Sequence, residues 1–147
     1  MGILNITPDS FSDGGRYLDP EAALAQALKL VEEGADILDL GAESTRPGAL
    51  PVTDREELER LLPVLKRVRQ EVSVPISIDT VRPEVAEECL DAGADIINDV
   101  SGLKRSGPGM AKVVKKFGAG LVLMHSRGTP ETMQTLASYG DVLADVI

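Results

Sequence analysis

A short apolar segment followed by a helical pattern recurs along this chain, and that repeat limits the possible folds more than any other feature. After an opening strand, the expected strands are "ADILDLG", "VPISIDT", "ADIINDVSG" and "AGLVLMHSRG", and helical patterns cover 19–34, 53–72, 82–93 and 107–118. The strands are apolar without strict alternation, which is typical of a parallel sheet covered by helices. Residues 129–147 are expected to be helical in part. The repeat predicts an α/β fold of five βα units.

The first helical pattern carries clear start and stop signals. Asp19 followed by Pro20 predicts an N-cap and a first helical residue, and Gly34 predicts the end. The spacing predicts an apolar face made of Leu24, Leu28 and Val31.

The second helical pattern begins with a capping box. Thr53 and Glu56 have the spacing that lets each side chain bond the backbone N–H of the other. Pro63 lies inside this pattern and is expected to bend the helix.

Two architectures fit five such units. One is a doubly wound, five-stranded parallel sheet, and the other is a (β/α)₈ barrel, which needs roughly 250 residues. The 147 residues suit one domain spanning 1–147. Length alone favours the doubly wound sheet, and a barrel would lack about three units.

Composition excludes several classes of partner. A net charge of −9 argues against nucleic acid or an anionic membrane, because both favour a basic surface. Cys89 is the one cysteine, which is consistent with a reducing compartment. The chain has no apolar run of roughly eighteen residues and no signal-like start, so we expect a cytoplasmic protein.

Each predicted strand ends in polar residues. These ends are Asn5, the region 39–43, Asp79, Asn98 with Asp99, and His125. In both architectures the carboxyl ends of the strands form the ligand-binding edge. Any one of these residues could instead cap a helix or bond loop amides, but five such ends in succession favour a site. Carboxylate and amide groups together suit a flat heterocycle with adjacent donors and acceptors.

The segment "GAESTRPGA" follows a predicted strand directly. It offers the hydroxyl groups of Ser44 and Thr45 and the guanidinium group of Arg46, beside Pro47 and Gly48. These groups suit a phosphate contact, although an ordinary turn with a solvated arginine is the alternative. The sequence has no P-loop and no GxGxxG after a strand, so nothing in it indicates a dinucleotide.

Several segments together resemble the dihydropteroate synthase family of folate biosynthesis. They are "MGILNITPDSFSDGG", "GADILDLGAESTRPG", "PISIDT", "ADIINDVSG" and "LVLMHSRGTPETMQ", in this order. The resemblance implies a (β/α)₈ barrel, here incomplete with strands 1–5, and so reverses the preference based on length. It implies a transferase in which 4-aminobenzoate displaces diphosphate from hydroxymethyl-dihydropterin diphosphate, giving 7,8-dihydropteroate. It also implies Mg²⁺ and a possible homodimer.

The resemblance assigns the pterin pocket to strand ends. Asp79 resembles the catalytic carboxylate that holds the pterin ring and stabilises positive charge as diphosphate leaves. Asn98 resembles the amide that completes pterin recognition. Val100 and Met124 resemble apolar walls of the pocket, with a plain core role an equal alternative for Val100. Asn5 resembles the residue that meets Mg²⁺ and diphosphate.

The other implied contacts lie in two loops. Thr45 and Arg46 resemble the residues that make the diphosphate and loop contacts. Phe11, in the segment "TPDSFSDGG", and Pro47 resemble walls for the aminobenzoate, and the Phe11 segment resembles a mobile loop over the diphosphate.

We interpret His125 as a structural residue rather than a base.

Two departures from the family pattern bear on function. Ala42 stands where the family usually has a second glycine. The family's later strands carry a further pterin-binding aspartate, a lysine and basic phosphate-binding residues, and none can be assigned here. We therefore expect doubtful activity from these residues alone. The alternatives are a pterin-binding methyltransferase domain with a corrinoid partner, or a non-catalytic truncated pterin-binding barrel.

Overall fold

The fold is a single five-stranded parallel sheet with helices on one face. The computed structural model describes residues 1–7, 19–43, 52–125, 127, 135 and 138–146. The strands, paired in the order β1-β2-β3-β4-β5, are β1 (Gly2–Asn5), β2 (Leu38–Gly41), β3 (Ile76–Asp79), β4 (Ile96–Asp99) and β5 (Gly120–Leu123). The helices are α1 (Pro20–Glu32), α2 (Asp54–Arg69), α3 (Pro83–Asp91), α4 (Gly107–Phe117) and α5 (Val142–Val146).

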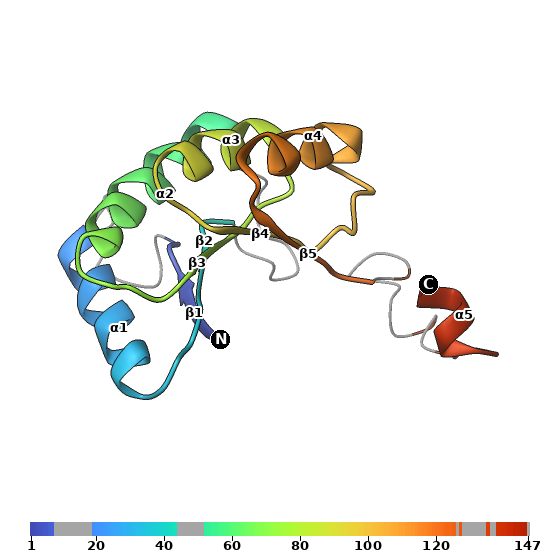
Figure 1. The fold of residues 1–147 in the computed structure, drawn as a ribbon, viewed down its shortest axis with the longest axis horizontal. Helices are drawn as coiled ribbons and strands as arrows, with labels where there is room; N and C mark the ends of the chain where they lie inside the picture. Colours follow the sequence, from blue (N-terminus) through green and yellow to red (C-terminus); the bar gives the residue numbers. More distant parts are fainter. Residues whose placement is uncertain (8–18, 44–51, 126, 128–134, 136–137, 147) are drawn as a thin grey trace.

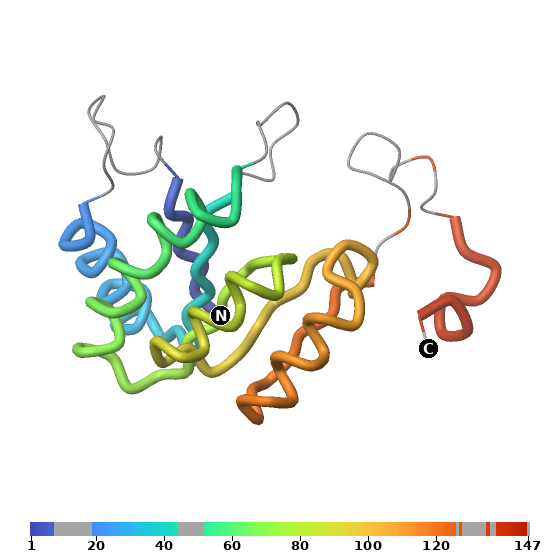
Figure 2. Tube along the Cα trace, turned by 90° about the horizontal axis from the view of Figure 1, so that it is seen from above, coloured from blue at the N-terminus to red at the C-terminus, as the bar shows by residue number. Residues whose placement is uncertain are grey.

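The strand order decides between the two architectures. A doubly wound sheet reverses its strand order at a switch point and has helices on both faces. Here each strand pairs with the next one along the chain, and α1 to α4 follow one another on the same side of the sheet (Figures 1 and 2). The doubly wound alternative is therefore wrong, and the sheet has the topology of consecutive units of a (β/α)₈ barrel.

Helix α1 begins and ends where the sequence predicts, and of the predicted apolar face Leu24 is buried and Val31 packs against the core. The Asp19 carboxylate accepts a hydrogen bond from the Glu21 N–H at 3.0 Å, and Gly34 has the left-handed φ of +100° that favours glycine. The buried residues are Ala23, Leu24 and Ala27. Leu28, the third residue of the predicted apolar face, is exposed. The face toward the sheet uses small alanines, which let the helix axis approach closely.

Helix α2 has the predicted capping box. The Glu56 N–H donates to the Thr53 hydroxyl at 3.2 Å, and the Thr53 N–H donates to the Glu56 carboxylate at 2.8 Å. The helix continues through Pro63, which lies on its exposed side. The bend expected at Pro63 stays a prediction. The buried face of α2 consists of Glu57, Leu61, Val64, Leu65 and Val68.

The two faces of the sheet differ in chemistry. Side chains alternate between the faces of a strand, so residues in register share a face. One row of register partners, on the face covered by the helices, is entirely apolar: Leu4, Leu40, Ile78, Ile97 and Leu121. This row forms the core with the buried faces of the helices. The opposite face carries the strand ends Asn5, Asp79 and Asn98 and has no helix over it (Figure 1).

Helix α5 lies apart from the sheet in both views (Figures 1 and 2). It lies within the region 129–147, which was expected to be helical in part. Within the described residues, no helix combines the length and the apolar character needed to cross a membrane.

Candidate functional site

The polar strand ends form one row along the carboxyl edge of the sheet. The row consists of the register partners Asn5, Gly41, Asp79, Asn98 and Val122. These residues share the face of the sheet opposite the helices, which is the face that points into the barrel in a (β/α)₈ fold. The structure places Asn5, Asp79 and Asn98 in this one row. Asp79 and Asn98 lie on neighbouring strands, whereas Gly41 on β2 lies between Asn5 and Asp79. Gly41 adds no side chain beside the Asp79 carboxylate, whose Oδ2 lies 3.5 Å from where a Cβ would be.

A second row lies one step deeper on the same face. Its members are Ile3, Asp39, Ser77, Ile96 and Gly120. Asp39 is only 5% exposed, and its Oδ2 accepts a hydrogen bond from the Asn98 Nδ2 at 3.2 Å. This bond spans from β2 to β4 across β3. Within the described part of the chain, Asp39 Oδ1 and the Ser77 hydroxyl are buried without a hydrogen-bond partner.

Asp79 has the titration behaviour of a site residue. Burial raises its pKa from 3.8 to about 6, and the negative charges of Asp39, Glu57, Glu43 and Asp99 act in the same direction. A carboxyl group with such a pKa is still mostly ionised at neutral pH. Strongly perturbed carboxylates at a ligand-binding edge are typical of functional sites.

Val100 and Met124 lie at the same carboxyl edge. Val100 follows β4 directly and is half-buried, whereas Met124 follows β5 and is exposed. The Met124 N–H donates to the Asp99 carbonyl at 3.1 Å, which continues the strand ladder. Gly102 has a φ of +59°, and a Cβ there would lie 2.7 Å from the Met124 carbonyl oxygen. The loop after β4 can therefore approach Met124 only with glycine at this position.

Asp99 is a structural residue rather than a ligand-binding one. Its carboxylate accepts hydrogen bonds from the Ser101 N–H and hydroxyl, at 2.8 and 2.6 Å, and from the Leu103 N–H at 3.2 Å and the Ser106 hydroxyl. Burial alone would raise the pKa of Asp99, but these bonds hold it below its ordinary value. The strand end Asp99 therefore organises the loop between β4 and α4. This is the loop-bonding alternative that the sequence left open.

His125 follows β5 and is exposed. Its ring centroid lies 5.9 Å from that of Tyr139. The structure gives it no contact with Asp79 or Asn98, and its interpretation as a structural residue stays a prediction.

A partly buried ion cluster lies at the same edge on the helix side, and sequence reasoning missed it. The Arg82 guanidinium group bonds the carboxylates of Glu43 at 2.7 Å and Asp54 at 3.0 Å, the Glu57 carboxylate, and the Val52 carbonyl at 2.7 Å. Arg82 thereby joins residues that precede and follow the segment 44–51. Burial raises the pKa of Glu57, although the positive charge of Arg82 opposes that rise. A usable signal was present, because Glu57 lies on the apolar stripe of its helix, where a carboxylate needs a partner.

The loop residues assigned by resemblance are outside the described part of the chain. They are Phe11, Thr45, Arg46 and Pro47. Their roles stay predictions.

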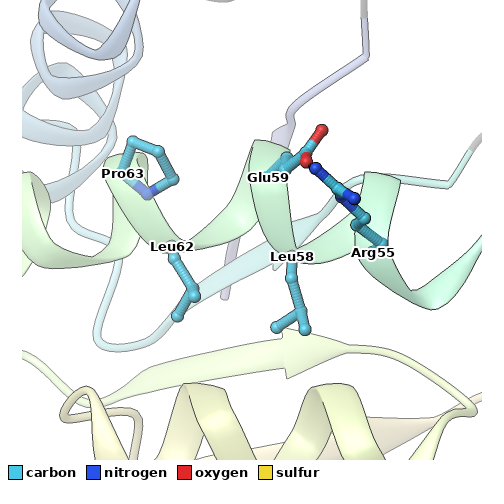
Figure 3. Close-up of a pocket in the computed structure, with 5 residues that line it drawn as sticks. All are labelled: Arg55, Leu58, Glu59, Leu62 and Pro63. Carbon is cyan, nitrogen blue, oxygen red and sulfur yellow. The ribbon is translucent and has the colours of Figure 1, made fainter.

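A surface hollow on α2 is separate from this edge. Leu58 and Leu62 extend from the same side of the helix, with Arg55, Glu59 and Pro63 around them (Figure 3). Both leucines also pack against the core. The hollow belongs to the helical layer, on the other side of the sheet from Asp79 and Asn98, so it takes no part in the candidate site.

Comparison with known proteins identifies the family of this chain. The sequence profile described as "pterin binding enzyme" matches residues 1–147. The chain belongs to the pterin-binding enzyme family. The predicted resemblance is thereby confirmed at the level of the family.

Relatives of this pterin-binding chain are named dihydropteroate synthase. The Synechocystis protein of that name is 51% identical over 146 residues, which are 99% of this chain and 50% of that protein. The Xanthomonas albilineans dihydropteroate synthase structure with 4-aminobenzoic acid has a TM-score of 0.80 at 47% identity, covering 99% of this chain and 50% of that one. The Clostridium difficile enzyme in the presence of pteroic acid has a TM-score of 0.84 at 44% identity, covering 99% and 52%.

The pterin-binding chain thus spans about half the length of these relatives. Its five strands in sequential order correspond to consecutive units of their α/β fold. The incomplete (β/α)₈ barrel implied by resemblance is therefore confirmed, in place of the doubly wound sheet.

Proposed function

We propose that this chain carries the pterin-binding part of a dihydropteroate synthase, a transferase of folate biosynthesis. The observation that carries the proposal is the pairing of Asp79 with Asn98, in register at the carboxyl edge of β3 and β4. High identity to proteins named dihydropteroate synthase supports the reaction. The proposed substrates are hydroxymethyl-dihydropterin diphosphate and 4-aminobenzoate.

The two side chains match the edge of a pterin ring. The Asp79 carboxylate accepts hydrogen bonds, and the ring presents adjacent N–H donors to such a group. The Asn98 amide can both donate and accept. A carboxylate in a site with little water bonds an N–H pair strongly, which makes Asp79 the main anchor of the ring.

The same geometry supports a reaction with electrostatic stabilisation. The C–O bond to diphosphate breaks and leaves positive charge on the pterin methylene carbon. The negative charge of Asp79 stabilises that carbon through the ring. The aminobenzoate nitrogen then forms the C–N bond with its lone pair and releases a proton to solvent. A weak amine suffices because the electrophile is cationic.

Asn5 fits the Mg²⁺ ion that the resemblance implies, as a single ligand. Its side chain is exposed at the end of β1, and an amide oxygen is a hard donor that Mg²⁺ accepts. The described residues include no group of three or more His, Cys, Asp or Glu side chains that could hold a metal. Substrate phosphates and water would complete the coordination. When bound, the ion supplies positive charge beside the departing diphosphate.

Asp79→Asn is expected to weaken pterin binding by about 1.5–3 kcal/mol, because one charged acceptor becomes neutral. Calorimetric titration with 6-hydroxymethylpterin measures the change, and formation of dihydropteroate should fall with it when residues 1–147 are part of a complete barrel. The control is Asp91→Asn, the same change at an exposed helix end. Unchanged pterin affinity in Asp79→Asn would remove Asp79 from the pocket.

The same variant should be more stable than the wild type at neutral pH. The folded-state pKa of Asp79 is raised to about 6, so the ionised carboxylate is disfavoured in the fold. This penalty, about 3 kcal/mol, is nearly complete at pH 7 and disappears as the pH falls below the ordinary pKa. A gain in stability at pH 7 but not at pH 3.5 separates a site residue from a structural one.

Phe11→Ala is expected to raise the Michaelis constant for 4-aminobenzoate more than that for the pterin substrate. The resemblance makes Phe11 a wall for the aminobenzoate, and an aromatic wall contributes through its contact area. Steady-state kinetics with each substrate varied in turn measures the split. Equal effects on both constants would contradict this role.

A cytoplasmic location, which the sequence led us to expect, and a homodimer, which the resemblance implies, are also part of the proposal. An assay for dihydropteroate formation separates the synthase from the two alternatives. A corrinoid-dependent methyltransferase domain or a non-catalytic module would bind pterin without forming that product.

A further inference from the structure

We propose that Asp39 is a positioning residue of the pterin pocket, which fixes the end of the Asn98 amide that faces the ligand. The inference deepens the proposed function and rests on it, because it concerns the same pocket. Asp39 lies in the deeper row, within one of the segments that carry the resemblance to the synthase family, but the resemblance assigns it no role.

The hydrogen bond between these two residues sets the orientation of the amide. A carboxylate only accepts hydrogen bonds, so the group that Asn98 turns toward Asp39 must be its NH₂. The 3.2 Å contact between Asn98 Nδ2 and Asp39 Oδ2 has this geometry. The Asn98 carbonyl oxygen then remains for a donor of the ligand. With the amide reversed, two oxygens would face each other.

Packing alone does not account for an aspartate at this position. Asp39 is 5% exposed, and its Oδ1 has no hydrogen-bond partner among the described residues. A buried carboxylate oxygen without a partner destabilises a fold. Ile3 and Ile96, in the same row, show that apolar side chains fit this face. The aspartate therefore serves the site rather than stability.

The buried charge of Asp39 also acts on Asp79. The groups that face Asp79 are Asp39 from β2, Glu43 after β2, Glu57 from α2 and Asp99 from β4, and all raise its pKa in addition to the effect of burial. Arg82, a cation that contacts two of these carboxylates, is paired with Glu43 and Glu57. Removing the Asp39 charge should therefore lower the pKa of Asp79. This effect gives the proposal a readout that a packing role would not change.

The test is Asp39→Asn with residues 1–147 as part of a complete barrel, titrated with 6-hydroxymethylpterin from pH 5 to pH 8. At pH 7.5 the affinity should fall roughly fivefold, because a neutral amide no longer dictates the Asn98 orientation. Affinity rises with pH as Asp79 ionises, and the midpoint of this rise should move to lower pH by roughly 0.5 or more. The Michaelis constant for 4-aminobenzoate should not change. Asp36→Asn, at the exposed start of the same strand region, is the matched control.

Each outcome decides the matter. A wild-type protein that binds no pterin would reject the proposed function, and this inference with it. A wild type that binds pterin and an Asp39→Asn variant with the same affinity and midpoint would overturn the positioning role alone. If Asp39→Asn does not fold, Asp39→Ser removes the same charge. Failure of both variants to fold would show that Asp39 is structural, which also overturns the proposal.

Discussion

Arg82→Met is expected to lower the free energy of unfolding by about 3 kcal/mol. Arg82 is 13% exposed and bonds three carboxylates, one of which, on Glu57, is completely buried. Removing the guanidinium group leaves the Glu57 carboxylate buried without its cation. The cost of such a group, rather than the loss of the ion pair itself, makes this one of the two largest effects that the structure predicts. Denaturant unfolding of the variant and the wild type measures it.

The pH dependence of this loss identifies its cause. Without Arg82, the folded-state pKa of Glu57 should rise further above its ordinary value. The penalty is then fully present at pH 8 and shrinks as the pH falls and Glu57 takes up a proton. The double variant Arg82→Met with Glu57→Leu should recover much of the stability. Arg55→Ala breaks an exposed pair with Glu59 and is the control, expected to change stability little. A loss that is the same at pH 5 and pH 8 would contradict the buried-charge explanation.

The elements of this fold could be predicted from local signals. Asp19, Gly34 and the Thr53–Glu56 capping box mark their helix ends because capping depends on residues only a few positions apart. Leu28 shows the limit of such reasoning. Periodicity identifies an apolar stripe, but the face that packs on the sheet depends on how closely the helix approaches. In α1 the buried face includes Ala23 and Ala27.

Strand order was beyond local reasoning. Length favoured a doubly wound sheet, because a count of units carries no information about which strands pair. Only the resemblance to a known family predicted the sequential order that the sheet has.

The candidate site divides in the same way. The rule that parallel strands present their carboxyl ends at one edge correctly brought Asp79 and Asn98 together. The Asp39–Asn98 bond and the Glu57–Arg82 pair join residues 59 and 25 positions apart, across elements whose register no local pattern sets. Asp99 was grouped with the strand ends, yet alternation turns it to the helix side, where it bonds its own loop.

A polypeptide limited to residues 1–147 is expected to show negligible dihydropteroate synthesis and to self-associate or be partly disordered. Strands β1 and β5 are the two edges of the sheet, and each offers an unpaired side to other chains. The face opposite the helices is also uncovered at both edges, where Ile3 is 63% exposed and Val122 is 43% exposed. In a closed barrel such inward-facing side chains pack in layers with those of the remaining strands.

Co-expression should reverse both defects if the barrel can assemble from two pieces. The relatives are about twice as long as this chain, so the C-terminal half of the Synechocystis synthase is a suitable partner. It would cover Ile3 and Val122, pair with β1 and β5, and supply the lysine and basic residues that the resemblance places in later strands. Size-exclusion chromatography and the dihydropteroate assay, with and without the second half, measure assembly and turnover. A monodisperse monomer of residues 1–147 that forms dihydropteroate unaided would contradict this prediction. The five strands would then suffice for a stable core and for all the residues that the reaction needs, despite the open edges and the uncovered face.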